Sequence, residues 1–243
     1  MPIAIAHRGD PVSERENTLL AFSAAVHEGA DMVELDLRRT RDGELVVLHD
    51  ATLSRLWRID RAVADLDLAT VREVGHGELR IPTFCQILDA IDVPIMVDFT
   101  GDEVVEGAVR AVRDAGAMGR ALFVTGHVGA LRALRSLAPE ARIGLTWIES
   151  TPPSPSLLEE LGAEFWNPTF GLVTPEIVAT MHALGLKVST WTVDEARDIE
   201  RVTSAGADAI VSNRIADLRS FLSGLLGPGR GSRACVSPAL PGE

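Results

Sequence analysis

Short apolar runs alternate with amphipathic segments along most of the chain. The apolar runs suit buried strands at 3–6, 32–37, 93–98, 121–124, 142–147, 164–167, 187–192 and 209–212. Between them, apolar residues recur at helical spacing and predict helices that include 102–115, 128–137, 175–184, 194–204 and 215–225. Strand–helix alternation at this spacing is typical of right-handed βαβ units and a parallel sheet.

The number of units and the chain length favour a closed barrel. Eight strand–helix units in 243 residues match a (β/α)8 TIM barrel, which has about 250 residues, better than an open doubly wound sheet. No Gly-x-Gly-x-x-Gly follows the first strand, which argues against a dinucleotide-binding domain. We therefore predict an α/β fold with a single barrel domain over residues 1–225.

Two segments depart from the alternation. Residues 51–80 are irregular, and we predict a small excursion from the barrel after the second strand, with short helices around 54–58 and 69–74. Residues 226–243 are rich in Gly, Pro and Ser and have no period, so we expect a disordered C-terminal tail.

The second strand, at 32–37, carries the first sign of chemistry. Its apolar residues share one face, and Glu34 and Asp36 share the other. Two carboxylates that point the same way repel one another, and a hard divalent cation with oxygen ligands is their natural partner. Taken alone, the strand is equally compatible with a solvated acidic edge. After the Asp42-Gly43 turn, a second short strand at 45–48 leads directly into His49.

The predicted barrel brings further reactive residues to the same place. In a barrel the functional site lies at the C-terminal ends of the strands. The first three strands and the segment after the second end there in a set of ionisable side chains: His7, Arg8, Glu34, Asp36, His49 and Asp98. Trp147 and Trp166, on the fifth and sixth strands, are either pocket walls or part of the barrel core.

Composition narrows the class of partner. The chain has 23 basic and 35 acidic residues, and the formal charge of −12 argues against nucleic acid and anionic membranes. A small phosphate-bearing substrate stays compatible, because a bound cation reverses the local field. Cys85 and Cys235 make no disulfide framework. The absence of a signal-peptide pattern and of long apolar runs predicts a cytoplasmic protein without stable membrane insertion. The oligomeric state stays open.

The motifs in their order resemble those of the glycerophosphodiester phosphodiesterases. The resemblance rests on HRG at 7–9, ENT at 16–18, ELD at 34–36, DGELVVLHD at 42–50, IPTF at 81–84, WTVD at 191–194 and GADAIVSN at 206–213. It implies a barrel enzyme that uses a divalent metal, Mg²⁺ or Ca²⁺. It also implies hydrolysis of glycerophosphodiesters to sn-glycerol 3-phosphate and an alcohol.

The resemblance further implies a role for each residue. Glu34, Asp36 and Asp98 would be the metal ligands, and His7 and His49 the acid/base pair. Arg8 would bind the phosphate, and Trp191 would form an aromatic wall of the pocket. Glu16 and Asn17 would be supporting residues. Glu16 is expected to orient Arg8 or the start of the following helix. The residues do not decide which histidine is the base. Either water or the glycerol 2-hydroxyl can be the nucleophile, and the resemblance favours the hydroxyl.

The chain departs from the family pattern at several positions. Asp98-Phe99-Thr100 stands where Glu-x-Lys is usual, and Asp194 replaces a usual asparagine. The shorter Asp98 and the missing lysine leave two alternatives open. One is a different phosphodiester substrate, such as a lysophospholipid or a phosphoinositide head group. The other is a weakly active or inert ligand-binding barrel, although the retained histidine pair argues against a pure binder.

Thr100→Lys tests whether the missing lysine alters activity. We expect the restored cation to change kcat/KM or the preference among phosphodiesters, because a positive group facing the phosphate is worth roughly a few kcal/mol in the transition state. Another basic group such as Arg38 would compensate in the natural chain. Steady-state kinetics on a panel of phosphodiesters measure the effect. Unchanged kcat/KM and unchanged preference would contradict the prediction.

Overall fold

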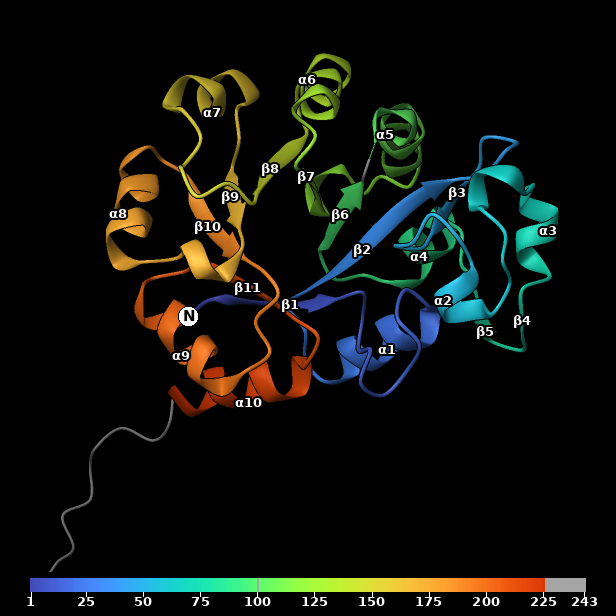
Figure 1. Ribbon diagram of the computed structural model, residues 1–243, viewed down its shortest axis with the longest axis horizontal. Helices are drawn as coiled ribbons and strands as arrows, with labels where there is room; N and C mark the ends of the chain where they lie inside the picture. Colours follow the sequence, from blue (N-terminus) through green and yellow to red (C-terminus); the bar gives the residue numbers. More distant parts are fainter. Residues whose placement is uncertain (100, 226–243) are drawn as a thin grey trace, which may run out of the picture.

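A computed structural model describes residues 1–99 and 101–225 (Figure 1). The predictions on Thr100 and on the tail at 226–243 therefore lie outside the described residues. The strands are β1 (Ile3–His7), β2 (Met32–Arg39), β3 (Leu45–Val47), β4 (Gly75–His76), β5 (Leu79–Arg80), β6 (Ile95–Phe99), β7 (Ala121–Thr125), β8 (Arg142–Trp147), β9 (Phe165–Pro168), β10 (Lys187–Thr190) and β11 (Ala209–Ser212).

Helices follow the barrel strands and surround the sheet (Figure 1). They are α1 (Leu19–His27), α2 (Ser54–Trp57), α3 (Leu68–Arg72), α4 (Phe84–Ala90), α5 (Val105–Asp114), α6 (Val128–Leu137), α7 (Pro155–Leu161), α8 (Pro175–Ala183), α9 (Ala196–Ser204) and α10 (Ile215–Leu225). Single 3₁₀ turns lie at Val63–Asp65, Asp102–Val104, Met118–Arg120 and Phe170–Leu172. Among the described residues, no helix is both long and apolar enough to cross a membrane.

The main sheet closes into a barrel, as predicted. Its parallel strands follow the order β1-β2-β6-β7-β8-β9-β10-β11, and β1 pairs with both β2 and β11. The additional strand β3 pairs antiparallel with the end of β2, outside the ring. The predicted (β/α)8 fold is therefore confirmed. The closure makes β1, β2 and β6 neighbours, and these are the strands that carry the predicted chemistry.

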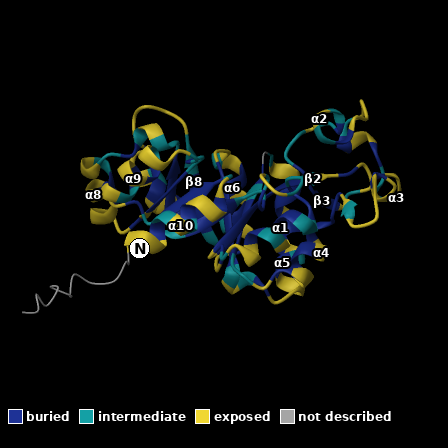
Figure 2. Ribbon diagram, turned by 90° about the horizontal axis from the view of Figure 1, so that it is seen from below, coloured by how far each residue is buried: buried dark blue, intermediate teal, exposed yellow. Residues whose placement is uncertain are grey.

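Side-chain alternation divides the core into two layers. Val33, Leu35 and Leu37 on β2 pack outward in the large cluster between barrel and helices. Ile5 and Phe165 belong to a smaller cluster inside the barrel. In Figure 2 the barrel strands are mostly buried, and the helices around them combine buried and exposed residues. Because side chains of a strand point alternately to its two faces, outward packing of the apolar β2 residues turns Glu34 and Asp36 inward.

The same alternation determines whether Trp147 and Trp166 face the pocket or the core. Trp166 is fully buried in the outer cluster and follows the inward Phe165, so it is core between barrel and helices rather than a pocket wall. Trp147 packs partly buried against that outer cluster, and its Nε1 donates to the Thr151 carbonyl. The pocket alternative for these residues is therefore wrong.

The excursion has a hydrophobic core of its own. Trp57 and other apolar residues of 51–80 pack with Val46 and Leu48 beside β3, on the right in Figure 1. Its helices α2 and α3 lie where short helices were predicted, whereas the small hairpin of β4 and β5 was not predicted. A two-residue strand carries no readable alternation, which is why the pattern missed it.

Candidate active site

The turn after β1 is shaped by backbone constraints in the HRG motif. Arg8 adopts φ 57° and Gly9 φ 86°. A side chain at Gly9 would place its Cβ 2.6 Å from the carbonyl carbon of Ala21, so glycine is required both for conformation and for space. The Arg8 backbone N–H donates to the carbonyl and to the carboxylate Oε2 of Glu34, each at 3.0 Å. These bonds tie the end of β1 to β2.

A cavity of about 150 Å³ opens at the C-terminal end of the barrel. Its wall contains the residues predicted for metal binding, acid/base chemistry, phosphate binding and the aromatic wall: His7, Arg8, Glu34, Asp36, His49, Asp98 and Trp191. Apolar side chains from the barrel interior and Asn167 complete it. The structure therefore brings these seven residues together. Glu16 and Asn17 lie behind the wall and contact Arg8 and Asp36 respectively.

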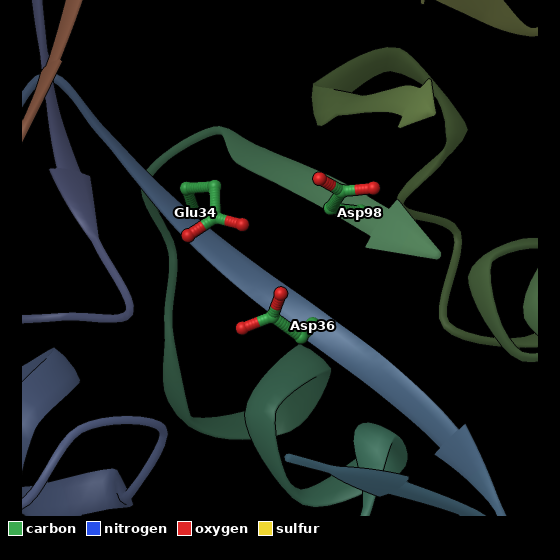
Figure 3. Close-up of side chains that lie close together, drawn as sticks. All are labelled: Glu34, Asp36 and Asp98. Carbon is green, nitrogen blue, oxygen red and sulfur yellow. The ribbon is translucent and has the colours of Figure 1, made fainter. Parts of the chain in front are cut away.

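Three carboxylates from two adjacent strands form one cluster (Figure 3). Glu34 and Asp36 project from β2 and Asp98 from the neighbouring β6, where Asp36 and Asp98 are paired in register. One oxygen from each lies within 4.8 Å of the others. Glu34 and Asp36 are each only 4% exposed, so water screens their mutual repulsion poorly.

The electrostatics of the cluster call for a cation. Burial and the neighbouring Asp36 raise the pKa of Asp98 to about 8. Burial, Asp36 and Asp98 together raise the pKa of Glu34 well above its usual range. Closely spaced carboxylate oxygens are the donors that Mg²⁺ and Ca²⁺ prefer, and a divalent ion would remove the repulsion that raises these pKa values. The residues present therefore fit such an ion.

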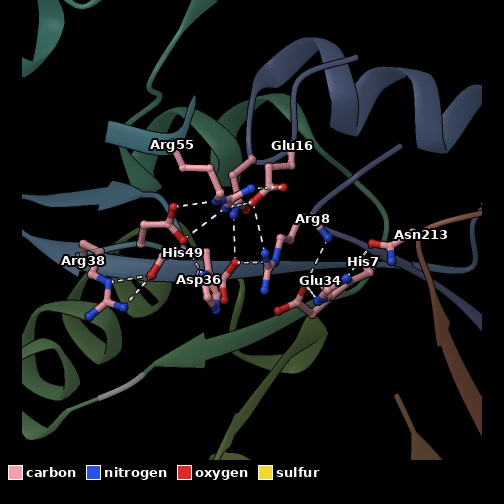
Figure 4. Close-up of polar contacts among 11 residues, drawn as sticks. His7, Arg8, Glu16, Glu34, Asp36, Arg38, His49, Arg55 and Asn213 are labelled. Carbon is pink, nitrogen blue, oxygen red and sulfur yellow. Dashed lines mark hydrogen bonds and ion pairs between the residues drawn. The ribbon is translucent and has the colours of Figure 1, made fainter. Parts of the chain in front are cut away.

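Arg8 partly neutralises the acidic cluster (Figure 4). Its Nε lies 3.1 Å from Asp36 Oδ2, and its Nη1 donates to Glu16 Oε1 at 3.0 Å. Asn17 Nδ2 donates to the same Asp36 oxygen at 2.8 Å. These contacts leave the second Asp36 oxygen for the cavity. Glu16 thus contacts Arg8, one of the two elements that the sequence predicts it to orient.

His7 is held by a chain of hydrogen bonds from the last strand. Its Nδ1 lies 2.7 Å from Asn213 Oδ1, and Asn213 Nδ2 donates to Asp194 Oδ2 at 2.8 Å. Because Asp194 accepts from the amide nitrogen, the amide oxygen must face His7, and an oxygen can only accept. His7 therefore carries its proton on Nδ1, and its Nε2 lies at the cavity wall, 3.9 Å from Glu34 Oε2. Burial and Arg8 lower the pKa of His7.

His49 has a different partner. Its Nδ1 lies 2.7 Å from Asp50 Oδ1, so Nε2 is the ring nitrogen left for the cavity. Asp50 is in turn bound by Arg55 from α2, and the hydrogen bonds from Arg55 lower the pKa of Asp50 to about 2. Arg38 donates from Nε to the His49 carbonyl at 2.8 Å, so this arginine holds the loop. Among the residues that the structure describes, Arg8 is the basic side chain on the cavity wall.

Several residues of the site escaped the sequence reasoning. Asn213 and Asp194 lie inside motifs that carried the family resemblance, but their contact joins β11 to the loop after β10. Arg55 comes from the irregular excursion. Asn167 lines the cavity from β9, and its signal was available, because it alternates with the inward Phe165 two residues earlier.

Comparison with known proteins identifies the family of this chain. The model of the glycerophosphoryl diester phosphodiesterase family matches residues 7–217. The chain belongs to this family. It is 30% identical over 227 residues to a glycerophosphodiester phosphodiesterase of Caldanaerobacter subterraneus subsp. tengcongensis, covering 87% of this chain and 93% of the relative. A glycerophosphodiester phosphodiesterase of Bacillus altitudinis is 25% identical over 227 residues, covering 86% and 93%. The resemblance inferred from the motifs is therefore confirmed, and the family is one of phosphoric diester hydrolases.

Solved structures share the fold of this family member. An Oleispira antarctica phosphodiesterase in complex with the product sn-glycerol-3-phosphate matches with a TM-score of 0.85 at 23% identity, over 92% of this chain and 97% of the other. The glycerophosphodiester phosphodiesterase of Thermotoga maritima matches with a TM-score of 0.80 at 20% identity, over 90% and 98%. At these identities the matches establish the shared barrel.

Asp98→Asn tests the charge repulsion in the cluster. The folded-state pKa of Asp98 lies above its unfolded value, so its ionisation destabilises the metal-free protein progressively as pH rises from about 4 through 8. We expect the variant to melt several degrees higher than the parent at pH 9 without metal, and to differ little at pH 4. Calorimetry of dialysed protein measures this, with the exposed Asp89→Asn as a control. A parent and variant that respond equally to pH would contradict the prediction.

Proposed function

We propose that this protein hydrolyses glycerophosphodiesters to sn-glycerol 3-phosphate and an alcohol, with a divalent cation as cofactor. One observation carries the proposal: two imidazoles, each held through its Nδ1, share a cavity wall with three carboxylates and an arginine. A phosphodiester needs these groups, because its negative charge repels a nucleophile and its leaving alkoxide needs a proton. The family membership and the product named in the Oleispira complex support this substrate class.

The charged residues of the wall would hold the phosphate. Glu34, Asp36 and Asp98 supply the oxygen ligands for Mg²⁺ or Ca²⁺. A bound divalent ion would supply Lewis-acid stabilisation of the charge that develops on the phosphoryl oxygens. Arg8 contributes a second positive charge on the same side, and Glu16 and Asp36 keep its guanidinium in place. Trp191 closes the cavity, with its Nε1 bound to the Asn167 carbonyl at 3.0 Å.

The two histidines would divide the proton transfers. His7 suits the general base, because its lowered pKa keeps Nε2 unprotonated near neutral pH, and its Nδ1–H is committed to Asn213. In its doubly protonated form, with the Nδ1–H donated to Asp50, His49 would then give its Nε2 proton to the departing alkoxide. The attacking oxygen, for which the family resemblance favours the glycerol 2-hydroxyl, forms a bond to phosphorus as the bond to the alcohol breaks. A cyclic phosphate formed this way would be opened by water.

Metal-dependent release of glycerol 3-phosphate tests the function. We expect turnover of glycerophosphocholine or glycerophosphoethanolamine with Mg²⁺ or Ca²⁺, and its loss with chelator. His7→Ala and His49→Ala should each lower kcat by about 10²–10⁴-fold, because each removes one proton transfer. The exposed His127 lies off the cavity wall, so His127→Ala is the matched control. Folded protein that releases no product with either metal would overturn the proposal.

Asn213→Ala tests the part that the amide plays in fixing His7. Without the amide oxygen, the proton of His7 can move from Nδ1 to Nε2. Nε2 can then no longer act as the base. We expect kcat to fall by about tenfold or more while KM changes little, because the phosphate ligands stay in place. Steady-state kinetics across pH measure the effect. A variant with parental kcat would show that His7 needs no partner on Nδ1.

A further inference from the structure

Arg55 binds two carboxylates at once, although it lies outside the barrel. Its Nε donates to Asp50 Oδ2 at 2.6 Å. Its Nη1 donates to Glu16 Oε2 at 3.0 Å, and its Nη2 to Glu16 Oε1 at 2.6 Å. Nη2 also lies 3.1 Å from Asp50 Oδ1. The planar guanidinium matches this double use, since it presents donors along two edges.

Each of these carboxylates in turn holds a residue of the cavity wall. Asp50 Oδ1 lies 2.7 Å from Nδ1 of His49. Glu16 Oε1 accepts from Nη1 of Arg8 at 3.0 Å. Figure 4 shows Arg55 above the site, with its contacts leading to His49 on one side and to Arg8 on the other.

A second contact fixes the helix that carries Arg55. The guanidinium of Arg15, next to Glu16, stacks on the ring of Trp57 with its central carbon 4.5 Å from the ring centroid. Trp57 ends α2 and belongs to the hydrophobic core of the excursion. The loop between β1 and α1 is thus joined to α2 at two neighbouring points. This arrangement holds Arg55 over the carboxylates and makes the excursion a support of the site.

The exposure of Arg55 argues against stability as its main role. Its side chain is 47% exposed, against 14% for Glu16 and 22% for Asp50, and ion pairs that solvent reaches on one side contribute modestly to folding. By contrast, catalysis depends steeply on the placement of groups at the reacting atoms. A residue that orients two such groups therefore affects turnover more than stability.

We propose that Arg55 is a positioning residue that sets His49 and Arg8 together, through Asp50 and Glu16. This inference rests on the proposed function, since it assigns His49 to proton transfer and Arg8 to phosphate binding. Its two arms have separate signatures. Loss of the Asp50 arm lets the His49 ring turn and lowers kcat. Loss of the Glu16 arm loosens Arg8 and weakens phosphate binding, which raises KM.

Arg55→Met and Arg55→Lys test both arms in the full-length protein. For Arg55→Met we expect kcat/KM to fall by about tenfold to a hundredfold, with contributions from kcat and from KM. Arg55→Lys should recover only part of the loss. The lysine ammonium keeps the positive charge, but it can pair well with only one of the two carboxylates. Arg61, an exposed arginine of the same excursion, gives the control Arg61→Met with unchanged kinetics. Thermal melting should separate these variants from the parent by only a few degrees.

Double variants show whether the effect runs through the two carboxylates. Asp50→Asn should cost little further kcat in the Arg55→Met background, and Glu16→Gln should cost little further affinity for sn-glycerol 3-phosphate, measured by calorimetry with Mg²⁺. Arg55→Met kinetics equal to those of Arg61→Met would overturn the inference. The inference would also be overturned if the loss in each double variant equalled the product of the losses in its two single variants. If Arg55→Met does not fold, Arg55→Lys and its double variants decide by the same comparison.

A readout without turnover separates this inference from the proposed function. Nitrogen NMR of the imidazole rings reports which nitrogen of His49 carries the proton. When the ring is neutral this should be Nδ1 in the parent, and a mixture of the two tautomers in Arg55→Met and Asp50→Asn. A parent that positions His49 in this way but hydrolyses no glycerophosphodiester would contradict the proposed function alone. A His49 signal that Arg55→Met leaves unchanged would contradict the Asp50 arm alone.

Discussion

Repulsion among buried carboxylates is the constraint on which the site depends. Glu34, Asp36 and Asp98 crowd one end of the barrel, where burial and mutual charge raise the pKa values of Glu34 and Asp98. A fold that keeps such a cluster must place positive charge beside it. Arg8 provides part of that charge, and a divalent cation is suited to provide the rest. Once bound, the cation would reverse the local field and make the cavity suitable for an anionic phosphodiester.

The environment of the two histidines differs in a way that matches two chemical roles. His7 is mostly buried and bound to a neutral amide, whereas His49 is more exposed and bound to a carboxylate. In both rings Nδ1 is occupied, so both offer the same nitrogen to the cavity. Burial and Arg8 lower the pKa of His7, which suits this ring to accept a proton.

The positive charges around the site form layers. Arg8 lies on the cavity wall, Glu16 and Asp50 lie behind the wall residues they bind, and Arg55 neutralises both from outside the barrel. Glu16 and Asp50 each pair with Arg55 behind the wall, whereas in the described part of the chain the wall carboxylates share a single arginine, Arg8. The structure thus keeps its uncompensated negative charge where a cation can bind. The excursion contributes to this arrangement, since α2 carries Arg55.

Much of this could be predicted from the sequence, because periodicity acts locally. Alternation in 32–37 put Glu34 and Asp36 on one face, and eight repeated units predicted a barrel whose strand ends gather His7, Arg8 and Asp98. The same rule, applied to 164–167, would have turned Trp166 outward and Asn167 inward. Only the tertiary structure decided which side chains the site residues contact. Asp194 meets Asn213, and Arg55 meets Glu16, across 39 positions of sequence in the second case, through side-chain contacts that no period encodes. Composition and pattern select which face a residue takes, whereas barrel closure and the packing of the excursion select its neighbours, and those neighbours determine tautomer, charge and pKa.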